Sequence, residues 1–99
     1  MNYSEYTRFV IILNKIPGQE TKRETILRHI EHLKKLGNDG KLILCGPFTD
    51  HDAGMVIVNV ATKEDAEKIA KADPFVTEGV RTYDLRTWLL ACEKNNYLA

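Results

Sequence analysis

The chain has 99 residues, of which 43% are apolar, so it can form one compact hydrophobic core but is too short for two. Its fourteen basic and fourteen acidic side chains cancel. The sequence therefore lacks the charge excess with which nucleic-acid-binding and peripheral membrane proteins attract their partners. We expect a single domain over residues 1–99, with a core at about 7–88 and a tail at 89–99.

Location and redox state can also be predicted from the sequence. The first residues, MNYSEYTR, lack the basic and then apolar order of a signal peptide, and no apolar run is long enough to span a bilayer. These features predict a cytoplasmic protein with no membrane partner. Cys45 and Cys92 stand far apart, with no CxxC pair and no metal-binding Cys/His spacing. We expect no disulfide, no zinc site and no cofactor, and we expect Cys45 to be a small core residue.

The first strand follows a short lead-in at residues 1–6. Arg8–Ile16 has the branched and aromatic composition of a β-strand and ends at the turn signal Pro17-Gly18. Side chains alternate between the two sides of a strand. Both faces of this strand are therefore apolar, with Phe9, Ile11 and Leu13 on one side and Val10 and Ile12 on the other.

An amphipathic helix is predicted over Thr21–Leu36, with Thr21 as N-cap and Glu24 completing a capping box. At about 100° per residue, His29 lies on the shoulder of the apolar stripe and His32 lies farther round. Only His29 should then be half-buried, either as a packed ring with one structural hydrogen bond or as an acid-base group. The apolar stripe consists of Ile26, Leu27, Ile30, Leu33 and Leu36.

Two further strands are predicted in the middle of the chain. Lys41–Cys45 is a short strand that ends at Gly46-Pro47, where proline interrupts regular pairing. The loop over residues 48–54 contains Asp50-His51-Asp52, whose spacing matches no metal-ligand motif and is typical of a polar loop tip. Met55–Val60 is the third strand, apolar on both faces apart from Asn59.

The second helix ends at a carboxylate. It begins at Thr62, with Asp65 completing a second capping box. The helical spacing continues to Asp73, which Pro74 biases toward an extended backbone. Asp73 should then point inward, where it needs a partner or a cleft, because an unpaired buried carboxylate is costly. The inner face of this helix consists of Ala66, Ile69 and Ala70.

Val80–Trp88 mixes charged and apolar residues, as an edge strand does, and completes the order β-α-β-β-α-β. This order predicts an α+β fold of the ferredoxin-like type with an antiparallel sheet. Right-handed crossovers place both helices on one face of that sheet. Because the first and third strands are apolar on both faces, we expect a homodimer in which the two open sheet faces pack together.

Three motifs, in this order and at these distances, resemble the YCII-related domain family. They are HIEHLKKLGNDGKLILCGPF from His29 to Phe48, an Asp-Gly pattern near Asp52, and Ala72-Asp73-Pro74-Phe75 followed by Gly79. The resemblance extends from the first strand to Trp88. It implies a dimeric α+β barrel, similar in fold to muconolactone isomerase, which agrees with the homodimer expected from the strands.

The resemblance also implies an active site formed by a histidine and an aspartate, here His29 and Asp73. Members with established chemistry include a dehydrochlorinase that acts on a chlorinated aromatic. Many members have an arginine three residues before the histidine, where this chain has Ile26, so an anion-binding role would pass to Arg23 or Arg28. The expected substrate-binding residues are Gly46, Pro47, Phe48, Arg28 and Phe75.

Two functional hypotheses remain open. The first is an enzyme of lyase or isomerase type that acts on a small cyclic or acidic metabolite without a metal, with His29 as the acid-base group and Asp73 orienting its ring. The second is a non-enzymatic module that binds a small ligand in the same cleft. RNA binding on the open sheet is disfavoured because the central strands lack stacking aromatics. A metal site at His29, His32 and His51 rests on a speculative third ligand.

Overall fold

The computed structural model describes residues 3–99. Its strands are β1 (Thr7–Lys15), β2 (Leu42–Pro47), β3 (Ala53–Val58) and β4 (Arg81–Leu89), and its α-helices are α1 (Arg23–Asn38), α2 (Lys63–Ala72) and α3 (Pro74–Thr77). Short 3-10 helices, η1 and η2, lie at Ser4–Tyr6 and Glu93–Leu98. The expected lead-in is therefore helical from residue 4, and its first two residues lie outside the described part of the chain.

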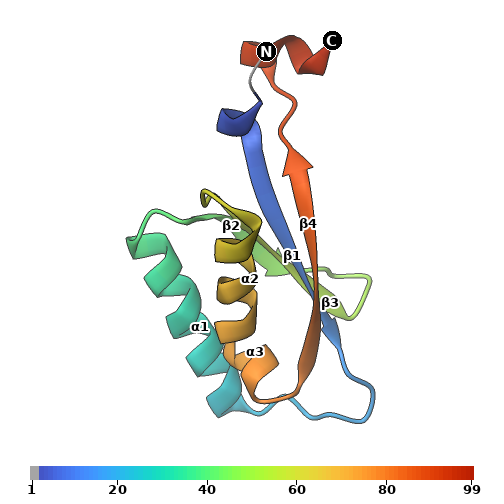
Figure 1. Ribbon diagram of the computed structural model, residues 1–99. Coiled ribbons are helices and arrows are strands. Elements are labelled where there is room, and N and C mark those ends of the chain that lie inside the picture. Colours follow the sequence, from blue (N-terminus) through green and yellow to red (C-terminus); the bar gives the residue numbers. More distant parts are fainter. Residues whose placement is uncertain (1–2) are drawn as a thin grey trace.

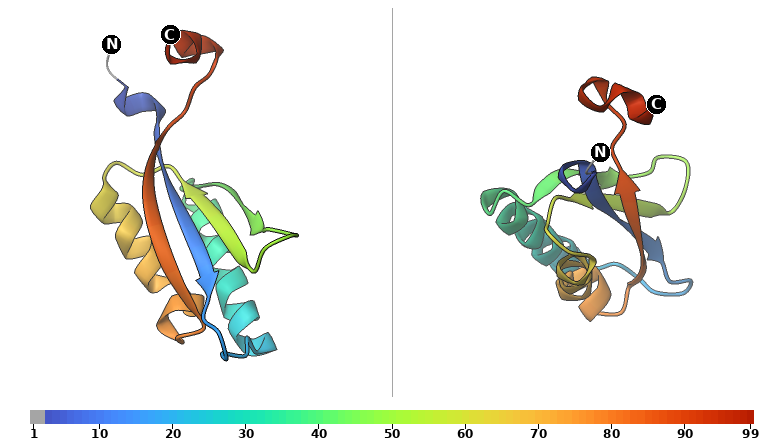
Figure 2. Two further views of the ribbon diagram at one scale, coloured as in Figure 1. Left: turned by 90° about the vertical axis from the view of Figure 1, so that its right-hand side faces the viewer. Right: turned by 45° about the horizontal axis from the view of Figure 1, so that its top comes forward.

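The strands form one sheet in the order β2-β3-β1-β4, and every neighbouring pair is antiparallel. In the register, Ile11 lies opposite Val56 on one side and Leu85 on the other. Helices α1 and α2 cover the same face of the sheet (Figures 1 and 2). The ferredoxin-like α+β fold predicted from the sequence is therefore confirmed, with β2 and β4 at the edges.

The core lies between the sheet and α2. The hydroxyl group of Thr62 accepts a hydrogen bond of 3.1 Å from the backbone N–H of Asp65, so the predicted start of α2 is correct. Alanines on the inner side of α2 let its backbone approach the sheet closely. The core cluster consists of Phe9, Ile11, Leu13, Val56, Val58, Ala66 and Ala70.

Helix α1 packs on a different face from the one predicted. The expected stripe is exposed at Ile26, Leu27 and Ile30, which are 38–47% accessible. The residues that turn inward recur at helical spacing and centre roughly 80° away from that stripe. His32 lies on this inward face, so the prediction that only His29 is half-buried is wrong. The inward residues are Thr25, His29, His32, Leu33 and Leu36.

Two local predictions also need correction. Helix α1 begins at Arg23, and its N-cap, Lys22, makes no side-chain capping bond, so the capping box expected at Thr21 and Glu24 is not formed. Cys45 is exposed and is not a core residue, because it lies on β2, an edge strand at the rim of the sheet. Pairing in β2 continues to Pro47, since an edge strand tolerates a residue without an N–H donor.

The second face of the sheet has no helix on it (Figure 2). By the alternation of side chains it carries Val10 and Ile12 of β1, and Leu44 on β2 is 65% exposed there. The chain is elongated, 45 × 29 × 20 Å, because the ends of β1 and β4 project past the helices (Figure 1). None of the helices within residues 3–99 has the length and apolar character needed to cross a membrane.

Candidate functional site

The structure brings His29 and Asp73 together at the junction of α1 with the end of α2. His29 Nδ1 lies 2.8 Å and 3.0 Å from the two carboxylate oxygens of Asp73. Their side chains are only 13% and 4% exposed. Because a carboxylate accepts hydrogen bonds, this contact places the Nδ1 proton toward Asp73 and leaves Nε2 with the lone pair of the neutral imidazole.

Local sequence explains how Asp73 reaches this position. Asp73 has an extended backbone, with φ −64° and ψ 127°, as expected for a residue that precedes proline. Asp73 is both the C-cap of α2 and the N-cap of α3. Its carboxylate accepts a hydrogen bond of 2.9 Å from the backbone N–H of Phe75. The backbone therefore leaves the helical path at Asp73, and the carboxylate of Asp73 points at His29 of α1.

Phe75 holds the imidazole from a second direction. The rings of His29 and Phe75 stack with their centroids 3.8 Å apart and their planes 12° apart. One nitrogen is thus fixed by a carboxylate and one ring face by an aromatic. Among residues 3–99 no protein group hydrogen-bonds Nε2.

A cavity of about 350 Å³ lies beside His29, between the first half of α1 and the facing ends of β2 and β3. Phe75 and Arg81 complete its wall. The β2–β3 end of the wall consists of small residues, which leave room for the cavity. The two strands also approach each other closely here, because the Cβ that an alanine would add at Gly54 would lie only 3.3 Å from the carbonyl oxygen of Gly46. The other lining residues are Leu13, Ile26, Leu33, Cys45, Gly46, Pro47, Ala53, Gly54, Met55 and Val56.

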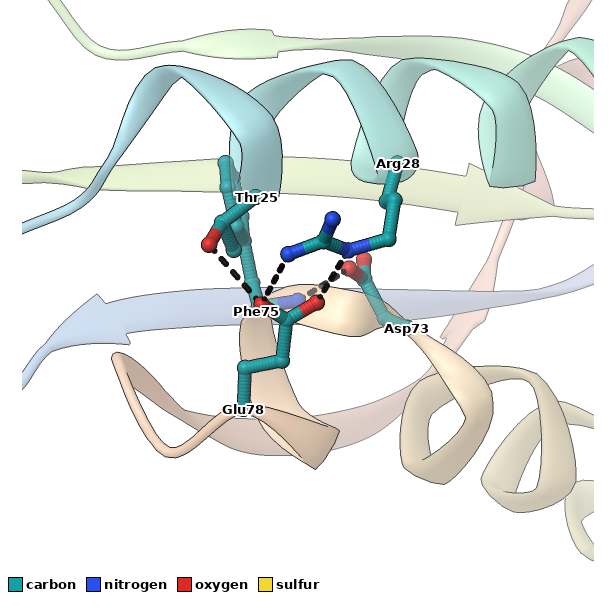
Figure 3. A network of polar contacts seen from close by, with 5 residues as sticks. All are labelled: Thr25, Arg28, Asp73, Phe75 and Glu78. Atoms are coloured by element: carbon teal, nitrogen blue, oxygen red, sulfur yellow. Dashed lines mark hydrogen bonds and ion pairs between the residues drawn. The ribbon is translucent and has the colours of Figure 1, made fainter.

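A polar network outside the cavity holds α1 against α3. Glu78 accepts hydrogen bonds from Arg28 at 2.6 Å and 2.7 Å and from the buried Thr25 hydroxyl group at 2.9 Å (Figure 3). The Arg28 and Thr25 bonds lower the pKa of Glu78 to about 2. Because Thr25 and His29 share the inward face of α1, this network fixes the rotation of the helix that brings His29 to Asp73.

The remaining predicted site residues divide into two groups. Gly46, Pro47 and Phe75 line the cavity. Arg28 does not line it, because Glu78 occupies its guanidinium group. Phe48 does not line it either and lies 38% exposed near His51.

Arg81 is the cavity residue that sequence reasoning missed, because it was interpreted as one of the surface charges of an edge strand. Arg23, the other candidate for an anion-binding arginine, is exposed and does not line the cavity. The available signal was the alternation of β4. Arg81, Tyr83 and Leu85 are less exposed than the residues between them, so Arg81 belongs to the helix-covered side.

His32 faces a different hollow, beside Ile69 and Asn59. Burial lowers its pKa, while the nearby Asp73 acts in the opposite direction. Within residues 3–99, no three His, Cys, Asp or Glu side chains converge as metal ligands, so the site considered for His29, His32 and His51 is not formed. The Asp50-His51-Asp52 segment is an exposed turn, as predicted.

The sequence is similar to that of known proteins. The sequence pattern of the YCII-related domain matches residues 7–89. The chain belongs to the YCII-related domain family. This YCII-related domain is 29% identical over 72 residues to the uncharacterised protein YjpA of Bacillus subtilis strain 168. The matched region covers 73% of this chain and 85% of YjpA.

A solved structure shares the fold. It is 5-chloro-2-hydroxyhydroquinone dehydrochlorinase from Burkholderia phenoliruptrix AC1100, in complex with 2,5-dihydroxybenzoquinone. The TM-score is 0.61 at 18% identity, and the match covers 82% of the YCII-related domain and 92% of the dehydrochlorinase. The shared fold agrees with the ferredoxin-like α+β architecture expected from the sequence.

Proposed function

We propose that this YCII-related domain is a small-molecule enzyme of lyase or isomerase type in which His29 is the acid-base group. The observation that carries the proposal is the His29 ring itself. Its Nδ1 is held by Asp73 and its ring face by Phe75, and the ring forms part of the cavity wall. A structural histidine would also bond its Nδ1 proton, so the acid-base role is favoured by the place of the ring in the cavity wall, with no hydrogen-bond partner for Nε2 among residues 3–99.

In this proposal each residue has a separate task. The Nε2 lone pair of His29 takes a proton from the substrate and returns it at a neighbouring atom or to a leaving group. Asp73 is a positioning residue, since it holds the tautomer and stabilises the imidazolium that forms, as the aspartate of a catalytic triad does. Gly46, without a side chain, lets the substrate approach the backbone of β2.

The substrate is small and mostly apolar. A cavity of about 350 Å³ is near the lower end of the range for small-molecule sites. The dehydrochlorinase that shares this fold binds 2,5-dihydroxybenzoquinone, a single substituted ring. A ring of that size, with one or two polar substituents, suits the volume and the apolar wall.

The alternative function is a module that binds such a molecule without converting it. The two functions differ in turnover, so the test screens cyclic carboxylic acids and hydroxyquinones in D₂O by NMR, including 5-chloro-2-hydroxyhydroquinone and 2,5-dihydroxybenzoquinone. An acid-base enzyme converts at least one compound or exchanges one of its carbon-bound protons. His29→Gln and Asp73→Asn should each lower that rate, His29→Gln by about 10²–10⁴.

The control is Lys63→Gln, at an exposed position at the start of α2, outside the cavity and away from the open sheet face. Circular dichroism must show that each variant folds. Compounds that bind with measurable affinity and never exchange or react would support the binding module. A conversion that His29→Gln leaves unchanged would refute the assignment of His29.

We also propose that the protein works as a homodimer through its open sheet face. Leu44 at 65% and Trp88 at 43% exposure lie on strands that no helix covers from that side, with Val10 and Ile12 between them. Exposed apolar surface of this kind marks an interface in a soluble protein.

The assembly is tested by sedimentation. A dimer has twice the 11.3 kDa mass of the chain. Leu44→Glu should shift the protein to the monomer, because the dimer interface would have to bury an unpaired charge. Ile43→Glu is the matched control, at a neighbouring exposed position in the bulge of β2. A wild-type protein that stays monomeric at concentrations of about 100 μM, which already allows for a weak dimer, would refute the proposal.

A further inference from the structure

Arg81 gives the cavity a positive charge whose hydrogen-bonding capacity is largely unused. Of the side chains that line the cavity within residues 3–99, only those of His29 and Arg81 carry nitrogen. The rest of the wall is aliphatic, aromatic, sulfur-containing or glycine. A ligand that enters this apolar space therefore meets an imidazole and a guanidinium group as its two charged or basic neighbours.

The protein holds this guanidinium group only weakly. Nη1 donates to the carbonyl oxygen of Asp52 at 3.4 Å and lies 3.6 Å from a carboxylate oxygen of the same residue. Both distances are at the long limit for such contacts. Nε is buried and has no hydrogen-bond partner among residues 3–99. An arginine has five N–H donors, and a buried donor without a partner is unfavourable.

Asp52 is a partner that a ligand can displace. Its side chain is 63% exposed, and its other carboxylate oxygen lies 3.3 Å from Lys15 Nζ. Asp52 can therefore turn toward Lys15 and solvent without losing all of its ionic contacts. Arg81 itself, with a side chain only 17% exposed, stays inside and becomes available to another carboxylate.

Phe75 sets the distance between the two polar groups of the cavity. Its ring stacks on His29, and the guanidinium carbon of Arg81 lies 5.5 Å from the same ring centroid. One aromatic ring thus contacts both the proposed acid-base group and the cation. A ligand of about one ring in length can contact both groups at once.

We propose that Arg81 binds the carboxylate of the ligand, and that the ligand is a cyclic or aromatic carboxylate with an otherwise apolar body. The planar guanidinium group matches a carboxylate with two parallel hydrogen bonds, which neutral groups cannot reproduce. The apolar wall takes the ring, and His29 Nε2 faces the carbon skeleton. This inference rests on the proposed site for its location, but it concerns binding and needs no turnover.

Benzoate and benzamide are suitable probes, because they share a ring and differ in charge. We expect wild-type protein to bind benzoate, measured by calorimetry, about tenfold or more tighter than benzamide. Arg81→Met keeps the apolar stem and removes the charge, and it should weaken benzoate binding about tenfold to one-hundredfold with little effect on benzamide. Lys63→Met, at an exposed position of α2 outside the cavity, is the control and should bind benzoate as the wild type does.

A second measurement keeps the test valid if Arg81→Met does not fold. The Nε–H signal of Arg81 in the wild-type protein should shift when benzoate is added and stay in place with benzamide. Equal affinities for benzoate and benzamide, unaltered benzoate binding in Arg81→Met, or an Nε–H signal that ignores benzoate would each overturn the proposal.

This test separates the two proposals. Benzoate binding that depends on Arg81 and survives in His29→Gln upholds carboxylate recognition even if no compound is ever converted. Conversion that depends on His29 and is indifferent to Arg81 upholds the proposed enzyme and overturns the role of Arg81.

Discussion

The contact between His29 and Asp73 predicts a thermodynamic coupling that can be measured without a substrate. Asp73→Ser removes the carboxylate and keeps a residue that caps α3, because serine is as good an N-cap as aspartate. His29→Phe removes the ring nitrogens and keeps a ring that can stack on Phe75. A cycle of the two single variants and the double variant then isolates the bond between Nδ1 and the carboxylate.

The size of this coupling follows from the geometry. Nδ1 lies 2.8 Å and 3.0 Å from the two oxygens, but it carries one proton, so the contact counts as one shared hydrogen bond. Side chains that are 13% and 4% exposed are little screened by water. A hydrogen bond to a charged group contributes about 1.5–3 kcal/mol, and we expect a coupling of about 2 kcal/mol.

The assay is urea unfolding at neutral pH, followed by circular dichroism at one protein concentration, because any dimer makes stability depend on concentration. Each single variant should lower the free energy of unfolding, and the double variant should cost about 2 kcal/mol less than the sum of the two. A coupling below about 0.5 kcal/mol, the usual error of additivity, would refute the view that this bond orients His29.

Three further predictions test other parts of the structure. The pKa of Glu78 is about 2 in the folded protein, below its ordinary value of 4.5, so its contribution to stability is present above about pH 4.5 and is lost as the pH falls toward 2. The wild type should therefore lose more stability over this interval than Glu78→Gln, measured by urea unfolding, and equal losses would contradict the network. Burial lowers the pKa of His32, so its ring signals should titrate by NMR with a midpoint below 6.5, and a midpoint at or above that value would contradict the packing of α1. Thr62→Ala should cost about 1 kcal/mol of unfolding free energy through the lost N-cap, whereas Thr62→Ser should cost little.

Much of the candidate site could be anticipated because its signals are local. A proline after Asp73 turns the backbone, and the helical spacing before it sets the direction, so an inward carboxylate follows from neighbouring residues alone. Gly46 and Pro47 line the cavity as expected, because a glycine has no side chain to keep a ligand from the backbone. By contrast, Arg81 lies on β4, where charged and apolar residues are mixed, so the pattern of the strand does not single it out. Its contacts are with Phe75 and Asp52, which belong to other parts of the chain.

The rotation of α1 shows where a periodic pattern misleads. Hydrophobicity favours burying Ile26, Leu27 and Ile30, yet the helix turns Thr25 and His29 inward. Hydrogen bonds from these two residues to Glu78 and Asp73 would be lost in the other orientation, and buried polar groups without partners are costly. Those partners lie 53 and 44 residues away in the chain, so helical periodicity carries no information about them.

The amino-acid sequence by itself determined the order of strands and helices, the apolar character of both faces of β1 and β3, and the inward turn at Asp73, because each depends on residues within a few positions of one another. Only the tertiary structure decided which face of α1 docks, that His29 meets both oxygens of Asp73, and that Arg81 shares the cavity with them. These are contacts between distant segments, and their geometry depends on how α1, α3 and β4 pack, which no local pattern specifies.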